Sequence, residues 1–361
     1  MTPRLELEGL SKRFGDVEAV RHLDLAIGSG EFLSLLGPSG CGKSTTLAMI
    51  AGFEQPTSGS VKVDGQIVTD VAPGRRRIGL VFQDYAVFSR LSVADNVSFG
   101  LEAQGVPRLD RARRIADIAA KLELEPLMGR RGGALNMSEM QRVALARALV
   151  TEPKLLLLDE PMSNLDAALR ASLRGELKLI QKQLDQSVLY VTHDQVEAMS
   201  MSDRIAVMRD GRLEQLGTPD AIYNRPATRF VAEFIGDPPI NMLPCTVRRS
   251  GSRAAVTSAL GEGLDLGNID LPEGTHTLGI RPHDLSVARE PRHGRARTTI
   301  RFLENLGAEH VLHLDYGGGL LAAVTAPGFA SPGEDVWIDA DARHLHFIRN
   351  DTDQVIRAEA Q

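Results

Sequence analysis

The sequence predicts an α/β domain followed by a smaller β-rich domain. Three observations indicate this order. A glycine-rich turn, GPSGCGKST at residues 37–45, stands between a short apolar stretch and a stretch with helical composition. A continuous apolar run that ends in two carboxylates, KLLLLDE at residues 154–160, is typical of a strand buried on both faces of a parallel sheet. Beyond residue 243, short alternating runs separated by Gly and Pro replace the helical spacing.

The composition excludes several functional classes. A chain of 361 residues predicts about two or three domains, and a net charge of −6 does not favour a nucleic-acid-binding protein. The amino-terminal segment MTPRLELEGL has no apolar core of a secretion signal, and the longest dense apolar run is too short to span a bilayer. Cys41 and Cys245 form no disulfide framework or metal pattern, so we expect a reducing compartment.

The turn at residues 37–45 satisfies the spacing G-x-x-x-x-G-K-S/T without a gap. Residues 31–36 before it have the pattern of a buried strand, and residues 44–51 after it that of a helix ended by Gly52, which is the context of a phosphate-binding loop. Glycines let backbone N–H groups turn inward, and the helix N-terminus adds partial positive charge. The nucleotide-binding residues predicted in this turn are Gly37, Pro38, Ser39, Gly40, Cys41, Gly42, Lys43, Ser44 and Thr45.

Three side chains of this turn have individual expectations. Lys43 is placed to reach the β- and γ-phosphates of a nucleotide, and Ser44 to bind Mg²⁺. Cys41 either fills the turn as a small residue or is a thiol whose pKa the surrounding N–H groups lower.

The first 36 residues predict strands, because apolar and charged residues alternate at residues 5–8 and again at residues 17–27. Phe14 falls in the expected loop between the two runs, where it either stacks on adenine or makes a minor core contact. Residues 59–68 predict a hairpin that turns at Asp64-Gly65.

Two carboxylates follow the apolar run of residues 154–158. The carboxyl ends of parallel strands carry ligand chemistry, so Asp159 is expected on the side of Mg²⁺ and Glu160 is expected to polarise water. The alternative is a helix N-cap followed by a first-turn acid. The phosphate loop upstream favours the catalytic interpretation.

Two further polar residues stand at the ends of predicted strands. Gln83 follows residues 78–82, where it reaches Mg²⁺ or the attacking water or has no special role. His193 follows residues 187–192, where it touches the γ-phosphate or is structural. If these strands are neighbours in one parallel sheet, both side chains lie at the edge where the phosphate loop begins.

The remaining segments complete the organisation. Residues 92–150 predict a helical insertion, with helical spacing at 92–101, 110–122 and 138–149. Residues 205–208 predict a strand with a hairpin at Asp210-Gly211, and Thr218-Pro219 begins a helix. A Gly-Asp-Pro-Pro linker divides an ATPase-like domain, residues 1–236, from a β-barrel or sandwich, residues 237–361.

In this order, the features of residues 1–236 resemble the ATP-binding-cassette (ABC) ATPases. The resemblance implies a P-loop NTPase cassette with an antiparallel β subdomain and a helical insertion. It further implies that Phe14 stacks on adenine, that Gln83 is the Q-loop glutamine and that Asp159 and Glu160 form the Walker B pair. The segment SNLD, ending at Asp166, resembles the D-loop, and His193 resembles the switch histidine.

Three other segments resemble a particular group within that family. IRPHDL at residues 280–285 resembles the regulatory barrel, an OB-like TOBE domain, of ATPase subunits of bacterial importers for sugars, polyamines, ferric ion and sulfate. SVADNVSFGLE at residues 92–102 and FIGDPPIN at residues 234–241 resemble the same group. The second of these is most similar to sugar-type members, which weakly favours a sugar or polyol as the solute, with polyamine next.

The resemblance also implies the mechanism and the partners. Two such ATPase subunits sandwich two ATP molecules with Mg²⁺, each ATP lying between one subunit's phosphate loop and the other's signature segment. Closure pushes on two transmembrane permease subunits, whose coupling helices dock near the Q-loop and the helical insertion. An extracytoplasmic solute-binding protein takes part indirectly. The chain is expected as a peripheral protein on the cytoplasmic face of the inner membrane.

The signature segment departs from the family pattern LSGGQ. An ungapped alignment of LNMSE puts Asn136 in the serine place and Met137 and Ser138 in the glycine places. Asn136 then caps the next helix with Glu139 in capping-box spacing, and its amide can donate to a phosphate. A gapped alignment makes Ser138 the cap, with Gln141 as its partner. Asn136 and Ser138 are therefore both expected near the partner's ATP.

The departure leaves two interpretations open. Loss of one preorganised donor to a reacting oxygen costs ~10²–10³ in rate, so a pair of these chains would carry two impaired sites. This chain would then work in a heterodimer with an ATPase that has an intact signature. Alternatively, the family tolerates the variation and a homodimer is active.

Two other classes of function compete with an importer ATPase. Related non-transport ATPases act in DNA repair or translation, but they commonly carry two cassettes or a long coiled coil, which this sequence does not show. A nucleotide-binding regulatory subunit would not hydrolyse ATP, and the presence of Glu160 and His193 argues against that class.

Overall fold

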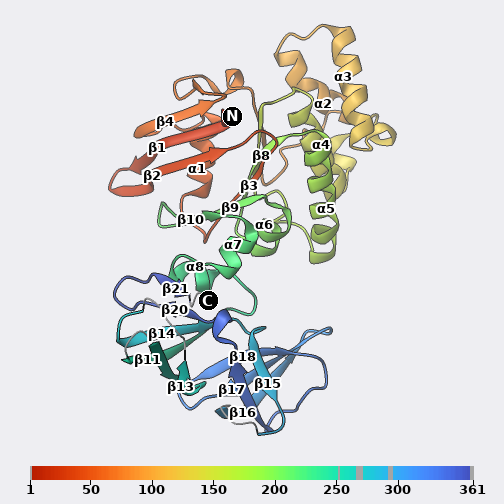
Figure 1. Cartoon of the computed structure of the whole chain (residues 1–361). Coiled ribbons are helices and arrows are strands. Elements are labelled where there is room, and N and C mark those ends of the chain that lie inside the picture. Colours follow the sequence, from red (N-terminus) through yellow and green to blue (C-terminus); the bar gives the residue numbers. More distant parts are fainter. Residues whose placement is uncertain (1, 251–252, 266–270, 292–295, 358–361) are drawn as a thin grey trace. The chain divides into compact units, whose positions relative to one another are not determined.

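The computed structural model describes residues 2–250, 253–265, 271–291 and 296–357. The chain divides into two compact units, Met1–Pro219 and Asp220–Gln361 (Figure 1). This division falls before residue 236, the expected border. The reason is that buried Arg281 of the second unit donates to the carbonyl oxygens of Tyr223 at 2.9 Å and Ala232 at 3.1 Å. These carbonyls belong to the helices α7 (Pro219–Asn224) and α8 (Arg229–Phe234).

A six-stranded, mainly parallel sheet forms the centre of the first unit. Its strand order is β10-β9-β3-β8-β7-β6, and β10 is the antiparallel edge strand. The carboxyl ends of β3, β6, β7 and β8 therefore meet at one edge, as the sequence predicts. The strands are β3 (Phe32–Leu36), β6 (Ile78–Val81), β7 (Leu155–Asp159), β8 (Ser187–Thr192), β9 (Arg204–Arg209) and β10 (Arg212–Gly217).

A second, antiparallel sheet carries the amino-terminal strands, with the order β2-β1-β4-β5. The expected hairpin at Asp64-Gly65 is confirmed. Phe14 is the last residue of β1 and does not lie in a loop, and it is 48% exposed, so the alternative of a core contact is wrong. The strands are β1 (Leu5–Phe14), β2 (Val17–Ile27), β4 (Ser58–Val63) and β5 (Gln66–Ile67).

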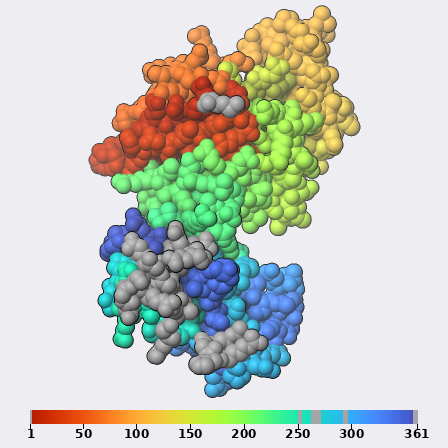
Figure 2. Space-filling view, viewed as in Figure 1, coloured from red at the N-terminus to blue at the C-terminus, as the bar shows by residue number. Residues whose placement is uncertain are grey.

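The expected helical insertion lies between β6 and β7. Within the first unit it forms a lobe beside the antiparallel strands, coloured yellow in Figure 2. Ser92 and Asp95 cap its first helix in a capping box. Its helices are α2 (Val93–Ala103), α3 (Arg108–Lys121) and α4 (Met137–Leu149). The other helices of this unit are α1 (Lys43–Ala51), α5 (Ala167–Gln183) and α6 (Gln195–Met201).

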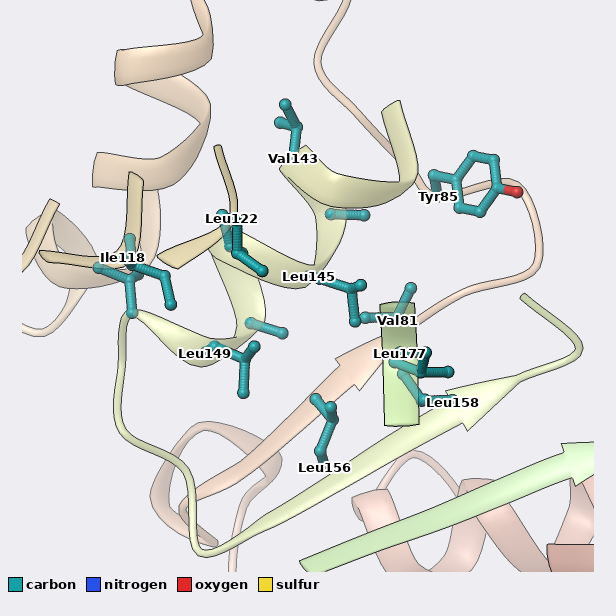
Figure 3. Close-up of a cluster of buried hydrophobic side chains, with 14 of the residues drawn as sticks. Val81, Tyr85, Ile118, Leu122, Val143, Leu145, Leu149, Leu156, Leu158 and Leu177 are labelled. Carbon is teal, nitrogen blue, oxygen red and sulfur yellow. The ribbon is translucent and has the colours of Figure 1, made fainter. Parts of the chain in front are cut away.

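Two hydrophobic cores lie on opposite faces of the central sheet. Successive strand residues point to opposite faces, so Leu156 and Leu158 pack against the helices of the insertion and α5 (Figure 3), whereas Leu155 and Leu157 pack toward α1 and the antiparallel sheet. Burial on both faces explains why β7 is a continuous apolar run. This packing holds the segment after β7 in a fixed place.

The second unit is rich in β structure, as the sequence predicts. Its two sheets have the orders β13-β12-β11-β14-β20-β21 and β15-β19-β16-β17-β18. The Asn241 side chain joins them by hydrogen bonds to both backbone groups of Ala322, at 2.7 and 2.8 Å. The strands are β11 (Asn241–Ser250), β12 (Arg253–Ser258), β13 (Gly261–Asp265), β14 (Gly274–Ile280), β15 (Leu285–Ala288), β16 (Ala296–Asn305), β17 (His310–Asp315), β18 (Leu320–Thr325), β19 (Asp335–Ala340), β20 (His346–Ile348) and β21 (Val355–Arg357).

Candidate active site

The phosphate loop joins the end of β3 to the start of α1, and its glycines are required by close backbone approaches. A Cβ atom on Gly37 would lie 2.3 Å from the carbonyl oxygen of Met208. Gly42, the N-cap of α1, has a φ of 103°, and a Cβ there would lie 2.4 Å from the carbonyl oxygen of Ala19. Gly42 has no side chain to cap the helix, so the first N–H groups of α1 are open to an anion.

The Lys43 side chain lies across this loop and is 5% exposed. Its ammonium group donates to the carbonyl oxygens of Gly37 at 2.7 Å and Pro38 at 3.0 Å. Burial and the adjacent charge of Glu160 raise the pKa of Asp159, whereas the charge of Lys43 lowers it. The charge of Lys43 therefore influences the carboxyl of Asp159, the last residue of β7.

Cys41 is a buried residue of the loop, not an activated thiol. Burial raises the pKa of Cys41, and the opposing influence of Lys43 does not cancel this. The interpretation of Cys41 as a thiol with a lowered pKa is therefore wrong, and the interpretation as a small residue that fills the turn is confirmed.

Glu160 and His193 face each other at the ends of neighbouring strands. Their side chains approach to 3.0 Å between His193 Nδ1 and Glu160 Oε2. The parallel pairing of β7 with β8 aligns Asp159 with Val191, and the backbone N–H of Glu160 donates to the carbonyl of Val191 at 2.9 Å. Glu160 has a φ of 44°, a conformation that is rare outside glycine and is often kept at functional sites.

Gln83 joins the same cluster through Ser163. The Gln83 amide donates to the Ser163 hydroxyl at 3.1 Å, and this hydroxyl donates to the backbone carbonyl of Glu160 at 3.0 Å. His193 therefore contacts Glu160 directly, and Gln83 is linked to Glu160 through Ser163. Asp166 lies at the end of that loop and caps α5 by accepting from the N–H of Leu169 at 2.9 Å.

Two residues that hold the Gln83 segment were not predicted from the sequence. The Tyr85 hydroxyl donates to the carbonyl of Pro161 at 2.8 Å, and burial raises the pKa of Tyr85 to about 12. Arg147 on α4 donates to the carbonyls of Ala86 at 2.6 Å and Tyr85 at 3.1 Å. The partners of Arg147 are about sixty residues away in the sequence, and no local pattern indicates them.

The altered signature segment begins α4. Asn136 is the N-cap and forms a capping box with Glu139: the Asn136 side chain accepts from Glu139 N at 2.9 Å, and the Glu139 carboxylate accepts from Asn136 N at 2.8 Å. The capping box expected for Asn136 and Glu139 is therefore confirmed. Ser138 is not the cap, because it already lies inside α4, and its expected partner Gln141 is 2% exposed. Arg130 pairs with Glu139 at 2.8 Å.

The structure brings some predicted site residues together and leaves others on separate elements. The phosphate loop, Gln83, Asp159, Glu160 and His193 lie at one edge of the central sheet. The remaining predicted residues lie at the end of β1, at the start of α4 and at the start of α5; they are Phe14, Asn136, Ser138 and Asp166.

The donors at this edge fit a magnesium ion that also binds phosphate. Within the described part of the chain, no group of three or more His, Cys, Asp or Glu side chains is arranged to hold a metal. Mg²⁺ commonly takes one or two carboxylates, waters and substrate phosphates. The single carboxylate of Asp159 and the Ser44 hydroxyl at the start of α1 match that pattern.

The N–H groups of the loop are open to an anion, so the loop can bind a triphosphate. The carboxylate of Glu160 and the ring of His193 face each other at the same sheet edge and can direct a water molecule at the terminal phosphate. The first unit is thus a nucleoside triphosphatase of the phosphate-loop class. Comparison with known proteins narrows this class. Residues 20–163 match the ABC transporter family, and residues 278–348 match the TOBE domain.

The chain has relatives over almost its whole length. It is 39% identical over 360 residues to the sn-glycerol-3-phosphate import ATP-binding protein UgpC 1 of Rhizobium johnstonii, covering 98% of this chain and 96% of that protein. It is 41% identical over 361 residues to the trehalose/maltose import ATP-binding protein MalK of Thermococcus litoralis, covering 96% and 97%. The chain belongs to the ABC transporter family, as an ATP-hydrolysing subunit of the importer type that carries a TOBE domain.

A solved structure supports the same assignment. That of cbiO1 from Clostridium perfringens, part of the ABC transporter complex cbiONQ, has a TM-score of 0.58 at 31% identity, covering 62% of this chain and 91% of that one. Across the described residues, the helices all fall short of the length and apolarity that a membrane crossing requires.

Proposed function

We propose that Glu160 is the general base of ATP hydrolysis and that His193 orients it and the γ-phosphate. The observation that carries this proposal is the 3.0 Å approach of His193 Nδ1 to Glu160 Oε2 beside the phosphate loop. A carboxylate held in this way can accept a proton from the attacking water. Gln83 is linked to Glu160, because its amide donates to the Ser163 hydroxyl, which donates to the backbone carbonyl of Glu160.

The loop residues 37–45 bind the triphosphate, and Lys43 exchanges its carbonyl partners for phosphate oxygens. Mg²⁺ would be held by Ser44 and Asp159, and the side-chain oxygen of Gln83, two residues after β6, would be a further ligand. When bound, this ion neutralises charge on the β- and γ-phosphates. Burial and the charge of Glu160 raise the pKa of Asp159, and a divalent cation bound there would favour its ionised carboxylate.

The ATPase works as a pair, with each nucleotide closed between one subunit's loop and the partner's α4. The exposed aromatic ring of Phe14 supplies a stacking surface for adenine. Asn136 and Ser138 present the start of α4 to the partner's ATP, and Asp166 lies on the segment that faces the partner. Since Met137 and Ser138 occupy positions where the family has glycine, the pairing partner is either a second copy or an ATPase with the usual signature.

A groove beside the Gln83 segment is the docking site for a permease. It has a volume of about 450 Å³ and is lined by Val87, Phe88, Ser89, Arg90, Leu91 and Phe99. The rings of Phe88 and Phe99 lie 4.8 Å apart between centroids and are 40% and 49% exposed. An exposed aromatic pair continuous with the Gln83 segment suits the apolar face of a short cytoplasmic helix. The chain then lies on the cytoplasmic face of the membrane, bound to two permease subunits.

The transported solute is a sugar or polyol, including phosphorylated polyols. The relatives are named as import proteins for sn-glycerol-3-phosphate and for trehalose and maltose. A solute-binding protein outside the membrane selects the solute, because this chain acts through nucleotide, a second ATPase subunit and the permease.

Uptake in cells tests this function. Cells that lack the gene are supplied with wild type, with Glu160→Gln or with Phe99→Asp, and the uptake of labelled glycerol 3-phosphate, maltose and spermidine is measured. We expect wild type to restore uptake of one of the first two compounds, and neither variant to do so. Phe99→Asp keeps ATP binding, because Phe99 lies in the insertion. Restored uptake by Glu160→Gln would contradict the proposed function.

A further inference from the structure

Arg170, on the first turn of α5, joins two loops that the mechanism treats separately. Its guanidinium donates to the backbone carbonyl of Leu165 at 2.9 Å, in the loop that ends at Asp166. It also donates to the carboxylate of Asp194 at 2.9 Å, directly after His193. One side chain therefore holds both the loop after Glu160 and the loop after β8.

The main chain on both sides of His193 is fixed by the same cluster. The Thr192 hydroxyl donates to Glu197 Oε2 at 2.7 Å, and the N–H of Asp194 donates to the Thr192 hydroxyl at 2.9 Å. Asp194 is the N-cap of α6 and accepts from the N–H groups of Val196 and Glu197 at 2.8 and 3.1 Å. His193 therefore lies between Thr192 and Asp194, which are joined to each other and to Glu197 by hydrogen bonds.

Glu197 is a buried carboxylate that the proposed mechanism does not use. It is 2% exposed and accepts hydrogen bonds from Thr192 and from the Tyr190 hydroxyl, both at 2.7 Å. Burial raises the pKa of Glu197, while the two hydroxyl donors and the charge of Arg170 lower it. Arg170 Nε lies 4.0 Å from Glu197 Oε1 and has no hydrogen-bond partner among the described residues, so its contact with this carboxylate is an ion pair and not a hydrogen bond.

We propose that Arg170 is a positioning residue for ATP hydrolysis, which makes the loop of residues 162–166 and the His193 loop move as one body. A displacement of the first loop, such as a partner subunit would cause, then shifts His193 relative to Glu160. This inference rests on the proposed role of His193. A guanidinium suits the task because its planar set of donors reaches Leu165 and Asp194 together, which a lysine ammonium on a flexible chain does not reproduce.

A double-mutant cycle on the full chain tests this inference. Steady-state hydrolysis of MgATP is measured for wild type, Arg170→Lys, His193→Ala and the double variant. We expect Arg170→Lys to lower kcat on the order of 10–100-fold, because a small misplacement of a reacting group has an effect of that size. The KM for ATP stays within about twofold, since the phosphate loop is untouched. In the His193→Ala background, Arg170→Lys has little further effect.

The outcomes separate this inference from its alternatives. Equal factors of loss in both backgrounds, or a raised KM at unchanged kcat, would overturn the positioning role. A wild-type rate in His193→Ala would instead overturn the proposed function. If the residual rate of His193→Ala is too low to measure, Arg170→Lys alone tests the inference: a lowered kcat at unchanged KM supports the positioning role, and a raised KM at unchanged kcat overturns it.

Two further variants guard against a purely structural effect. Asp194→Asn retains an N-cap side chain for α6 but weakens the pair with Arg170. It should therefore lower kcat as Arg170→Lys does, and it provides the test if Arg170→Lys folds poorly. Lys178→Gln is the matched control, because Lys178 lies on the same helix and pairs with Asp203 at 3.0 Å. We expect its kcat and KM to equal those of wild type. A loss in Lys178→Gln equal to that of Arg170→Lys would show that disturbing α5 anywhere suffices.

Discussion

His193 Nδ1 lies 3.0 Å from Glu160 Oε2, although the two residues are separated by the whole of α5 and β8. The parallel pairing of β7 and β8 brings them together, because it places the ends of both strands at one edge of the sheet. The unusual φ of 44° at Glu160 turns its side chain at that edge. A chain of hydrogen bonds through Ser163 then joins Gln83 to the same point.

Replacement of Gly42 by alanine should remove nucleotide binding. Gly42 has a φ of 103°, and a Cβ would lie 2.4 Å from the carbonyl of Ala19, so the loop must shift. Gly40 also has a positive φ, of 80°, but a Cβ there meets no atom within 4 Å. We expect Gly42→Ala to lose binding of a fluorescent ATP analogue, and Gly40→Ala to lose much less, since it carries only the backbone strain of about 1–2 kcal/mol. Equal affinities of the two variants would contradict the role of the close approach.

Restoring the family signature should increase hydrolysis. In the triple variant Asn136→Ser, Met137→Gly and Ser138→Gly, the start of α4 regains a backbone surface without side chains. We expect the rate to rise by about tenfold or more. The upper limit is the factor of ~10²–10³ that a single donor to a reacting oxygen contributes. The glycines should also lower the stability of α4 by about 1 kcal/mol each.

Measurement of kcat alongside thermal unfolding separates these two effects. The single variant Asn136→Ser is the control, because serine keeps the N-cap and leaves Met137 and Ser138 in place. An unchanged kcat in the triple variant would show that the altered signature does not limit a pair of identical chains. That result would remove the physical reason for a heterodimer.

The pair of cations on Asp64 should make the first unit sensitive to acid. Burial alone raises the pKa of Asp64, but a hydrogen bond from Lys154 and the charge of Arg4 lower it below its usual value. A carboxyl with a lowered pKa stabilises the fold above its unfolded pKa of about 3.9, and this contribution is lost as the pH falls through the folded pKa. The side chain is 29% exposed, so we expect about 1 kcal/mol.

Urea unfolding of wild type and Asp64→Asn checks this expectation. Asparagine tolerates the left-handed conformation of residue 64, whose φ is 49°, so the hairpin is retained. The difference in the free energy of unfolding should be constant above about pH 5 and should shrink toward pH 3. A difference that does not change with pH would contradict the charge effect.

The sequence was sufficient for the features that local rules determine. The turn at residues 37–45 has a fixed spacing, and the run of residues 154–158 is apolar on both faces, so the loop before α1 and the buried strand β7 could be predicted. Phe14 was expected in a loop, because the end of β1 is exposed and its sequence lacks the apolar alternation that marks a strand. The contacts that Arg281 makes with α7 and α8 could not be predicted, because more than forty residues separate them in the sequence.

The supporting shell of the site could not be predicted, because it depends on long-range contacts. Tyr85 reaches Pro161, and Arg147 reaches the carbonyls of Tyr85 and Ala86, across gaps that no periodic pattern spans. Arg170 and Glu197 are ordinary helix residues in the sequence, and their importance follows only from what they touch. Likewise, only the structure shows that Asn136, and not Ser138, caps α4.

The turnover and retention of ATP by Glu160→Gln test the central claim most directly. Glutamine has the shape of glutamate but cannot accept the proton, so we expect hydrolysis to fall by ~10²–10⁴ while MgATP stays bound and is recovered intact with the protein. Glu176→Gln, an exposed change on α5, should turn over ATP as wild type does. If Glu160→Gln hydrolyses ATP at the wild-type rate, ATP is not broken at the sheet edge where the phosphate loop, Glu160 and His193 lie.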